Sequence, residues 1–494
     1  TYAKASSTPA DPTIGVLDVL DLLNADMSKV ERFVHGVTIG TNAILEGKGA
    51  ESWMLVTKGF KDVLEIGRTN RPVLYNIRSQ KKPPLISRTR TREVDERLLF
   101  DGTVLKKIDA ADVQRAVGDL PKNDNLAVAV CFLHSYLNPE HERAAKAAVL
   151  QALPNAFVCT SSDVLPQFRE YERFNTTALN AYIGPLMRRY LSGLKAGLEK
   201  KGFRRDLYIM TSNGGVSTAE RAKQLPVATV LSGPAGGVAA AVHLGEMLNV
   251  PNIITCDMGG TSTDVCLIEN LRIPVTNEQK IAEYANRTPQ IEINAVGAGG
   301  GSIGWIDAGD ILMVGPQSAG AAPGPACYGR GGKQPTVTDA NLVLNRLAAE
   351  SPLAGGRIKL DPNLSMAALK PIASRLGLDE LRLADGIIKI AVARMVSAIK
   401  QISIANGFDP REFTLLPYGG AGPMHSVAIA EELEIPRVLV PLGPGNFAAF
   451  GSLISDIRRD YVKTRTMQIS ADSWPGIDAA FAEIERQATK DLVS

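Results

Sequence analysis

Hydrophobic and polar positions divide the chain into two stretches of different texture. Between Asp11 and about Pro226, short apolar runs that suit strands alternate with helical stretches, and charged residues are frequent. Examples of these segments are GVLDVLDLLNA (15–25), ESWMLVTKG (51–59), LAVAVCFLHS (126–135) and LYIMTSNGG (207–215). Such alternation predicts α/β layers.

Glycine and other small residues dominate the second stretch, from about Val227 to Gly451. Its glycine-rich segments are SGPAGG (232–237), DMGGTSTD (257–264), GAGGGS (297–302), a glycine-proline cluster (315–332) and YGGAGP (418–423). A single turn of this kind is usually only a turn. Their concentration in one half favours a phosphate-binding role for some of them.

The strongest local signal is IITCDMGGTSTDVCLIE. The apolar runs Ile253–Cys256 and Val265–Ile268 are rich in β-branched residues, so we expect a β-hairpin between them. Glycines at the tip allow positive φ and close backbone approach, and hydroxyl side chains follow directly. The residues that we expect to hold phosphate are Gly259, Gly260, Thr261, Ser262 and Thr263.

Asp257 ends the first of these strands and directs a carboxylate toward the same tip. A carboxylate beside a phosphate site requires a cation between them, and Mg²⁺ prefers one or two carboxylates together with phosphate oxygens and water. The alternative is a tight hairpin in which Asp257 caps its own turn. The segment is neither a G-x-x-x-x-G-K-[ST] loop nor a dinucleotide fingerprint, because Gly259 and Gly260 lead into a return strand and not a helix.

Composition narrows the class of protein. The 494 residues carry 54 Lys and Arg against 52 Asp and Glu, a net charge of +2, which does not favour nucleic acid as a partner. No apolar run is long enough to span a membrane, and the first residues lack the apolar region of a signal peptide. Five isolated cysteines without a C-x-x-C pair indicate buried thiols in a reducing compartment, so we expect a cytoplasmic location and no zinc site.

The hairpin resembles the phosphate loop of the actin, sugar kinase and Hsp70 ATPase superfamily. That fold places a nucleotide in a cleft between two α/β lobes. In LLPYGGAGPMH (415–425) an apolar strand leads into three glycines, which suits the adenosine-binding loop of such a fold. The residues expected to face adenosine are Gly419, Gly420 and Gly422; a simple connector is the alternative.

A sharper resemblance covers nearly the whole chain. The ordered motifs include HGVTIGTNAILEGKGA (35–50), IGRTNRPVLYN (66–76), FLHSYLNPEHE (132–142), PQFREYERFNTTALNAYIGPLM (166–187), INAVGAGGGSIGWID (293–307) and GPACYGRGGKQPTVTDANLVLNRL (324–347). Together with the glycine-rich loops, they resemble the hydantoinase A/5-oxoprolinase family. That family includes ATP-hydrolysing N-methylhydantoinase, 5-oxoprolinase and caprolactamase, and a related subunit of acetone and acetophenone carboxylases.

The resemblance implies an ATP- and Mg²⁺-dependent hydrolase of a cyclic amide, such as a hydantoin, N-methylhydantoin or 5-oxoproline. ATP would phosphorylate the amide oxygen, with Asp257 holding Mg²⁺ and, with Thr261, serving catalysis. It also implies a hetero-oligomer with a B-type subunit. Two alternatives remain open, namely a ketone carboxylase subunit and a non-catalytic actin-like scaffold.

The resemblance also predicts domain limits. Residues 1–226 would form a first lobe, 227–455 a second lobe with the phosphate and adenosine loops, and 456–494 the start of a C-terminal region. Family members begin with a D-x-G-G-T-F-T-D hairpin, and no second D-x-G-G-T occurs here. We therefore expect a chain truncated at both ends, with weak Mg-ATP binding where the first hairpin is absent.

Other positions carry weaker predictions. Gly299, Gly300 and Gly301 with Ser302 would line a cleft or form a hinge. Asp339 would cap a helix that follows a Pro-Thr-Val-Thr strand. RTRTREVDERLL (88–99) would be a solvated or interface surface. His35 is as consistent with a structural role as with a site, and Cys256 and Cys266 are expected in the core.

Overall fold

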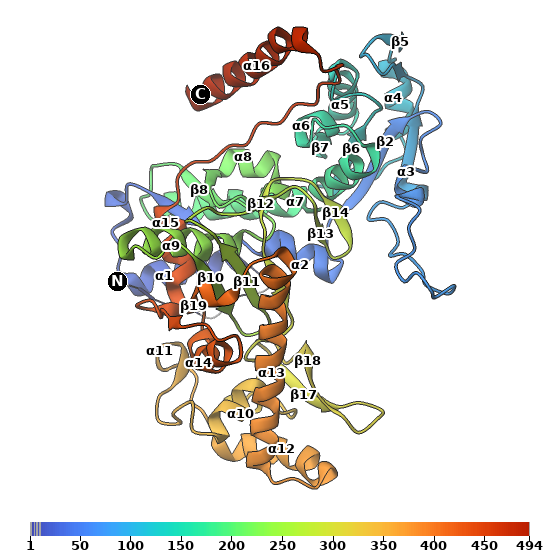
Figure 1. Cartoon of the computed structure of the whole chain (residues 1–494). Helices are drawn as coiled ribbons and strands as arrows, with labels where there is room; N and C mark the ends of the chain where they lie inside the picture. Colours follow the sequence, from blue (N-terminus) through green and yellow to red (C-terminus); the bar gives the residue numbers. More distant parts are fainter. Residues whose placement is uncertain (1, 4, 6–7, 9–10, 494) are drawn as a thin grey trace.

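The computed structural model describes residues 2–3, 5, 8 and 11–493. Much of the chain start, where the sequence predicts no signal peptide, lies outside these residues. Within the part described, none of the helices combines the length and apolarity of a membrane span. Figure 1 shows three bodies: a sheet with flanking helices at one end, a central region with two sheets, and a helical body at the other end.

The first body contains a four-stranded parallel sheet in the order β3-β2-β6-β7. Its strands are β2 (Glu51–Thr57), β3 (Thr91–Val94), β6 (Leu126–Cys131) and β7 (Phe157–Thr160). Alternate residues of β6 face opposite sides: Val128 and Val130 pack with α4 (Ala110–Val117) and α5 (Glu140–Ala152), while residues 127, 129 and 131 pack toward α7 (Glu170–Lys200). Both faces are buried, which explains why β6 is apolar throughout.

Peripheral elements complete this body. They are α3 (Val63–Ile66), α6 (Ser161–Val164) and a small antiparallel pair of β4 (Arg97–Leu98) and β5 (Val104–Lys106).

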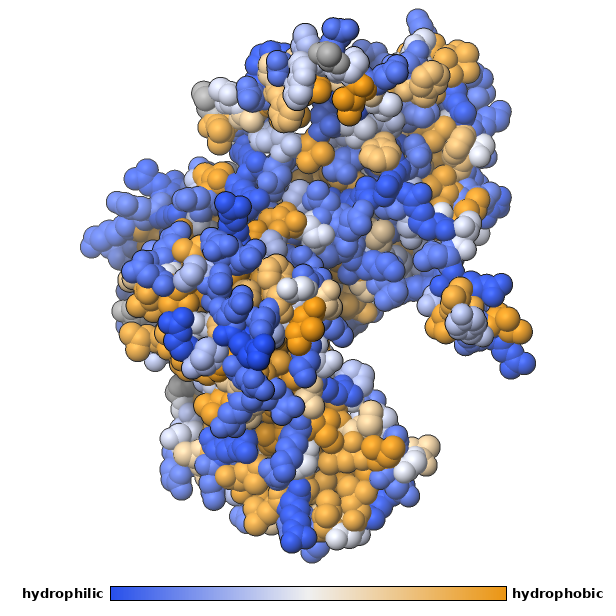
Figure 2. All heavy atoms as spheres, in the orientation of Figure 1, coloured by the Kyte–Doolittle hydropathy of each residue, from blue (hydrophilic) through white to orange (hydrophobic). Residues whose placement is uncertain are grey.

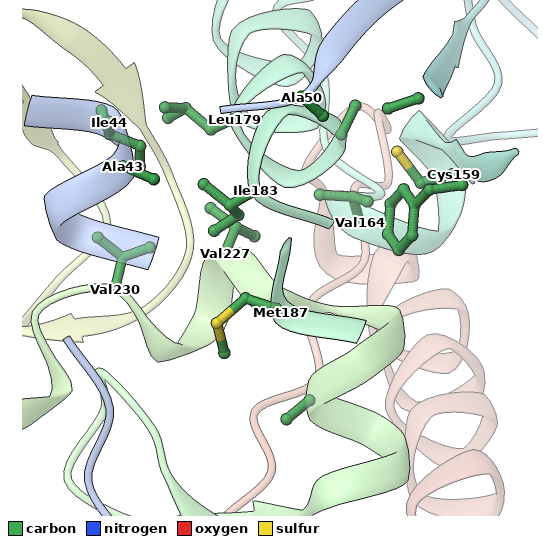
Figure 3. Packing of buried hydrophobic residues seen from close by; sticks show 14 of the residues in the cluster. Ala43, Ile44, Ala50, Cys159, Val164, Leu179, Ile183, Met187, Val227 and Val230 are labelled. Atoms are coloured by element: carbon green, nitrogen blue, oxygen red, sulfur yellow. The ribbon is translucent and has the colours of Figure 1, made fainter. Parts of the chain in front are cut away.

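The long helix α7 joins this body to the central region. Figure 3 shows Leu179, Ile183 and Met187 of α7 facing Ala43 and Ile44 of α2 (Ile39–Glu46). Beside them lies a three-stranded sheet of β1 (Phe33–His35), β8 (Leu207–Met210) and β9 (Val216–Thr218). Helices α1 (Pro12–Leu23) and α8 (Ala219–Gln224) pack on α7. One of the four apolar segments quoted from the first stretch is therefore a helix and three contain strands, as the α/β prediction requires.

The second sheet of the central region has the order β16-β11-β10-β19-β20. Its strands are β10 (Ile253–Met258), β11 (Thr263–Ile268), β16 (Asn294–Val296), β19 (Thr414–Tyr418) and β20 (Arg437–Val438). One face packs on α13 (Glu380–Ile402) and α14 (Gly422–Glu432). The other packs on α9 (Ser232–Leu248) and α15 (Phe447–Ile454), which lie against each other.

Beyond this sheet lies the helical body. It contains α10 (Val337–Val343), α12 (Pro362–Leu376) and most of α13, with the hairpin of β17 (Ser302–Ile306) and β18 (Leu312–Ser318) beside it. Before β19 the chain also forms the short helix α11 (Leu353–Gly356) and two short antiparallel pairs. The pairs are β12 (Val275–Thr276) with β15 (Gln290–Ile291), and β13 (Gln279–Ile281) with β14 (Tyr284–Asn286). After α15 the chain runs extended to the amphipathic α16 (Trp474–Val493), which stands near α5 in Figure 1.

Candidate functional site

The predicted β-hairpin is confirmed. Strands β10 and β11 pair antiparallel from Ile253 opposite Ile268 to Met258 opposite Thr263. Residues 259–262 form the tip, closed by a 3.0 Å hydrogen bond from the Gly259 N–H to the Ser262 carbonyl. Gly259, Gly260 and Thr261 are exposed. The tip is therefore a narrow, accessible turn at the end of a buried strand pair.

The glycines at this tip are not required by the hairpin itself. Glycine permits a positive φ at both positions, but neither Gly259 nor Gly260 has a backbone in that region. A Cβ added at Gly260 would meet no atom within 4 Å, and one at Gly259 would lie 3.9 Å from the Ser262 carbonyl oxygen. The missing side chains leave open space over the backbone, as a closely approaching ligand requires.

The glycine-rich segment 299–302 supports the tip from one side. Gly300 N–H donates to the Gly259 carbonyl at 3.0 Å, and Gly301 N–H donates to the Gly260 carbonyl at 2.6 Å. A Cβ at Gly299 would lie only 2.6 Å from the Thr261 backbone, so glycine is needed for this contact. This buried segment is a fixed support for the tip and not an open cleft lining.

Two carboxylates lie side by side below the tip. Asp257 and Asp264 are opposite one another in the strand register, so their side chains project from the same face of the sheet. Among the described residues, neither carboxylate has a hydrogen bond or ion pair. The alternative in which Asp257 caps its own turn is therefore not what the structure has.

Burial controls the ionisation of this pair. It raises the pKa of Asp257 to about 6. Burial, and then the neighbouring Asp257 charge, raises the pKa of Asp264 to about 7. Unpaired acids with raised pKa values at an accessible turn are typical of functional sites, because a cation or a proton must compensate their charge.

The second predicted loop meets the hairpin at this point. Strand β19 runs parallel to β10, with Tyr418 opposite Asp257, so both strands end at the same edge of the sheet. Gly419 has φ of +82°, and its added Cβ would collide with Asp257 and with the Met258 carbonyl. Gly420 is exposed with nothing near its Cβ position, whereas Gly422 is buried with its Cβ position 3.1 Å from the Cys256 carbonyl oxygen. Only Gly420 of the three leaves open space for a ligand.

The three hydroxyl residues of the hairpin differ in their availability. Thr261 is exposed and Ser262 is half-buried. Thr263 is buried, and its hydroxyl donates to the Ala298 carbonyl. The side chain of Thr263 therefore anchors the hairpin, while Thr261 and Ser262 remain free to contact a ligand.

The donor set suits one kind of cation. No group of three or more His, Cys, Asp or Glu side chains in the described part of the chain could hold a metal ion. Two adjacent carboxylates beside an open glycine turn match Mg²⁺, which takes few protein ligands and completes its shell with phosphate oxygens and water. The arrangement can therefore bind a magnesium-associated phosphate group.

Three weaker candidates are structural residues. His35 accepts or donates a 2.7 Å hydrogen bond with the Tyr190 hydroxyl, and burial lowers its pKa to about 4. Cys256 and Cys266 are buried, as expected, and burial raises the pKa of Cys256 to about 12. Neither thiol is available as a thiolate nucleophile near neutral pH.

Asp339 stabilises a helix start, although the predicted strand before it is absent. Thr336 is the N-cap of α10, and Asp339 is its third helical residue, completing a capping box. Its carboxylate also accepts hydrogen bonds from the amides of Ala326 and Cys327 and from the Ser365 hydroxyl. The helix includes part of the predicted strand because the Thr336 side chain terminates the extended backbone there.

The segment RTRTREVDERLL is only partly a solvated surface. Arg88 forms an exposed ion pair with Asp62, and the Arg92 guanidinium lies 4.7 Å from the Trp53 ring centroid. Glu96, however, is buried, accepts a hydrogen bond from the Thr57 hydroxyl and pairs with His141 at 2.7 Å. For Glu96 the prediction was wrong, because its buried carboxylate finds hydrogen-bond partners in the Thr57 hydroxyl and in His141 of α5.

Two models of known protein families match this chain. The family model described as Hydantoinase/oxoprolinase matches residues 173–461, and that of the Hydantoinase/oxoprolinase N-terminal region matches residues 1–153. The chain belongs to the hydantoinase/oxoprolinase family. The family resemblance predicted from the sequence motifs is thus confirmed.

Three curated relatives in this family have named activities. The caprolactamase subunit alpha of Pseudomonas jessenii is 38% identical, over 99% of this chain and 71% of that protein. The acetone carboxylase beta subunit of Xanthobacter autotrophicus is 32% identical, over 98% of this chain and 70% of that protein. The 5-oxoprolinase of Saccharomyces cerevisiae is 30% identical, over 98% of this chain but 41% of that longer protein.

Solved structures of family members share the fold. An ATP-dependent caprolactamase from Pseudomonas jessenii matches with a TM-score of 0.83 at 35% identity, over 99% of this chain and 72% of that one. A nucleotide-free acetone carboxylase matches with a TM-score of 0.83 at 29% identity and the same coverage. The mixed α/β architecture is therefore that of these ATP-dependent hydantoinase/oxoprolinase family enzymes.

Sequence reasoning missed the position of Asp264 beside Asp257. It recognised the residue as part of DMGGTSTD but assigned it no function. The available signal was the hairpin register: once Met258 pairs with Thr263, Asp257 must face Asp264. Reading the pairing as well as the tip composition would have placed both acids on one face.

Proposed function

We propose that this chain is the ATP-binding subunit of a two-component enzyme that hydrolyses a cyclic amide. The observation that carries the proposal is the half-buried pair Asp257 and Asp264 below an open glycine turn, for which the described residues supply no hydrogen-bond or ion-pair partner. In the proposed fold, two lobes enclose the nucleotide as in the actin, sugar kinase and Hsp70 superfamily. Residues 1–226 form one lobe, 227–455 the other, and 456–494 begin a further region.

Each part of the site has a proposed role. The open backbone at Gly259 and Gly260 and the hydroxyls of Thr261 and Ser262 hold the terminal phosphates. Asp257 and Asp264 hold Mg²⁺, which, when bound, neutralises phosphate charge. Gly420 leaves room for the adenosine part, while Gly419 keeps the loop close to Asp257. For Thr263, only the backbone remains available to a phosphate, because its hydroxyl is already bonded.

The proposed reaction uses ATP to activate the amide, because an amide carbonyl is by itself a poor electrophile. The amide oxygen attacks the γ-phosphorus of ATP, the bond to the β–γ bridging oxygen breaks, and ADP leaves. Water adds to the activated carbon, the ring C–N bond breaks, and a second water removes phosphate from the resulting acyl phosphate. Phosphoryl transfer depends mainly on positioning and charge neutralisation, which a rigid hairpin with two acids supplies.

The substrate class is a five-membered cyclic amide or imide, such as a hydantoin or 5-oxoproline. The second component is a B-type subunit, since relatives are named as subunits of caprolactamase and of acetone and acetophenone carboxylases. The likeness to acetone carboxylase supports one competing function, the ATP-dependent activation of a ketone for carboxylation. Measuring ADP release with hydantoin, with 5-oxoproline, and with acetone plus bicarbonate separates the two.

The site itself is tested by the Asp257→Asn variant. We expect isothermal titration calorimetry to show at least about a tenfold loss of Mg-ATP affinity, because one of two anionic ligands is removed. Asp478→Asn, an exposed acid on α16, is the matched control and should bind as the wild type does. Unchanged affinity in Asp257→Asn would contradict the site and favour a non-catalytic actin-like scaffold.

A further inference from the structure

The segment after α3 projects away from the rest of the molecule. We call residues 67–84 (GRTNRPVLYNIRSQKKPP) the basic arm, because it contains Arg68, Arg71, Arg78, Lys81 and Lys82 but neither Asp nor Glu. In Figure 1 it leaves the body below α3 and returns without forming a helix or strand. Figure 2 shows it as a separate projection in which hydrophobic and hydrophilic residues are mixed.

The base of the arm is fixed to the body. Arg68 forms a two-pronged pair with Glu172 of α7, at 2.8 and 2.5 Å. Lys81 donates to the carbonyls of Glu65 and Ile66 at the end of α3, at 3.0 and 2.8 Å. These contacts join both ends of the arm to the same corner of the body.

A second support comes from a segment two hundred residues away in the sequence. The turn between β13 (Gln279–Ile281) and β14 (Tyr284–Asn286) lies against the returning part of the arm, at Lys82 and Pro83. Lys82 donates to the Ala282 carbonyl at 3.0 Å and lies 4.7 Å from the Tyr284 ring centroid, while the Tyr284 hydroxyl donates to the Pro83 carbonyl. The arm is therefore held in position at its base, which lowers the entropy cost of binding.

The tip of the arm has no such contacts. The hydrogen bonds found for residues 70–80 are all internal, from Asn76 to Val73, Ser79 to Asn76, and Arg78 to the Asn76 side chain. Four large apolar side chains lie exposed within five residues: Val73 (54%), Leu74 (66%), Tyr75 (94%) and Ile77 (87%). Arg71 and Arg78, in the same described stretch, have no ion-pair partner. Tyr and Arg beside aliphatic residues are the composition of interface hot spots.

We infer that the basic arm is a docking element for the B-type subunit of the enzyme, whose matching surface is an apolar pocket rimmed by carboxylates. The inference rests on the proposed two-component function and deepens it. The apolar tip fits a pocket, because four exposed side chains in one turn are unfavourable in water. The arm contains no acid, and the described residues supply no ion-pair partner for the two arginines at its tip. The complementary rim is therefore negatively charged.

The test measures binding of the chain to its purified B-type subunit by surface plasmon resonance. The Tyr75→Ala/Ile77→Ala double variant should lose at least about 100-fold in affinity, mainly through faster dissociation. Leu381→Ala, an exposed leucine on α13, is the matched control and should bind as the wild type does. Mg-ATP affinity should be unchanged in all three proteins, which shows that the nucleotide site is intact.

A charge series tests the rim independently. Arg71→Glu/Arg78→Glu should slow association about tenfold at low salt, and the difference should shrink as ionic strength rises. Arg71→Lys/Arg78→Lys keeps the charge and should retain fast association. If the apolar double variant binds the B-type subunit as tightly as the wild type, the docking role is wrong.

Two further outcomes would overturn the inference in distinguishable ways. If sedimentation analysis shows that the double variant loses only self-association, the tip contacts a second copy of this chain. If the wild type binds Mg-ATP but no B-type subunit, the partner assignment fails while the nucleotide site, tested separately by Asp257→Asn, stands.

Discussion

Two groups of acids with raised pKa values in this molecule differ in whether their carboxylates have hydrogen-bond partners. Within the described part of the chain, the half-buried Asp257 and Asp264 below the β10–β11 tip have no hydrogen-bond or ion-pair partner, whereas the fully buried Glu142 on α5 lies in a saturated network. Burial is the largest cause of a raised pKa in all three residues. Neither burial nor a raised pKa therefore distinguishes the candidate site from a structural cluster; the missing partners do.

Both carboxylate oxygens of Glu142 accept hydrogen bonds. One accepts from the Phe132 amide at 2.8 Å and the Ser161 hydroxyl at 2.7 Å, and the other accepts from the Ser162 amide at 2.8 Å. The fully buried Arg173 donates to Ser161 and to the Phe132 carbonyl, completing the network. This cluster joins the ends of β6 and β7 to α5 and α7.

The largest effect is expected where that network is broken. Glu142→Ala leaves the Phe132 and Ser162 amides and the Ser161 hydroxyl without their acceptor in a dry interior. We expect a loss of about 3–5 kcal/mol in the free energy of unfolding, measured by urea denaturation at pH 7. Glu142→Gln keeps one acceptor oxygen and should cost less. If Glu142→Ala is as stable as the wild type, the distinction between the two groups of acids fails.

The sequence predicted the hairpin but not this cluster, for a physical reason. The β-branched runs and the glycine pair are local signals, so the strands and tip at residues 253–268 were accessible to pattern reading. Glu96, His141 and Glu142 occur in polar segments, and their burial depends on partners up to 45 residues away, as in the Glu96–His141 pair. Long-range pairing of this kind leaves no periodicity in the sequence.

The support of the tip was hidden for the same reason. The GAGGGS segment was recognised as glycine-rich, but its hydrogen bonds to Gly259 and Gly260 join residues about forty positions apart. Asp264 differs from these cases, because its position followed from the hairpin register. The fold class and the tip were thus predictable, whereas the support of the site was not.

Whereas substitution of Glu142 should destabilise the protein, substitution of Asp264 should stabilise it at high pH. Asp264 has a pKa raised from 3.8 to about 7, so the folded protein binds a proton there more tightly than the unfolded chain does. Its contribution to stability is fully present below the unfolded pKa and is lost as pH rises through about 7. Asp264→Asn cannot ionise, so it avoids this loss of stability. Its free energy of unfolding should be about 1–3 kcal/mol larger than that of the wild type at pH 8 and similar at pH 4.

Mg-ATP affinity should change in the opposite direction to stability. Asp264→Asn should bind Mg-ATP more weakly than the wild type, and wild-type affinity should rise from pH 6 to pH 8 as both acids lose their protons. Thermal melts and calorimetry across this pH range measure both quantities on the same samples. A variant that is less stable at pH 8 would show that Asp264 is compensated in the folded protein, as Glu142 is.

The smallest effect separates two threonines within the hairpin itself. Thr263 donates its buried hydroxyl to the Ala298 carbonyl, whereas Thr261 is exposed at the tip. Thr263→Val should therefore cost about 1 kcal/mol of unfolding free energy, because the Ala298 carbonyl loses its donor. Thr261→Val should change stability by less than about 0.5 kcal/mol, as expected for an exposed position.

The effects on activity should have the opposite order, because, of these two threonine hydroxyls, only that of Thr261 is free to contact a phosphate. We expect Thr261→Val to lower kcat for ADP release by about tenfold, the size of one lost hydrogen bond to a charged group, while Thr263→Val stays within about twofold. Thr261→Ser, which keeps the hydroxyl, should restore activity. Equal losses in Thr261→Val and Thr263→Val would mean that the hairpin acts only through its shape, and that the open turn above the two acids contacts no phosphate.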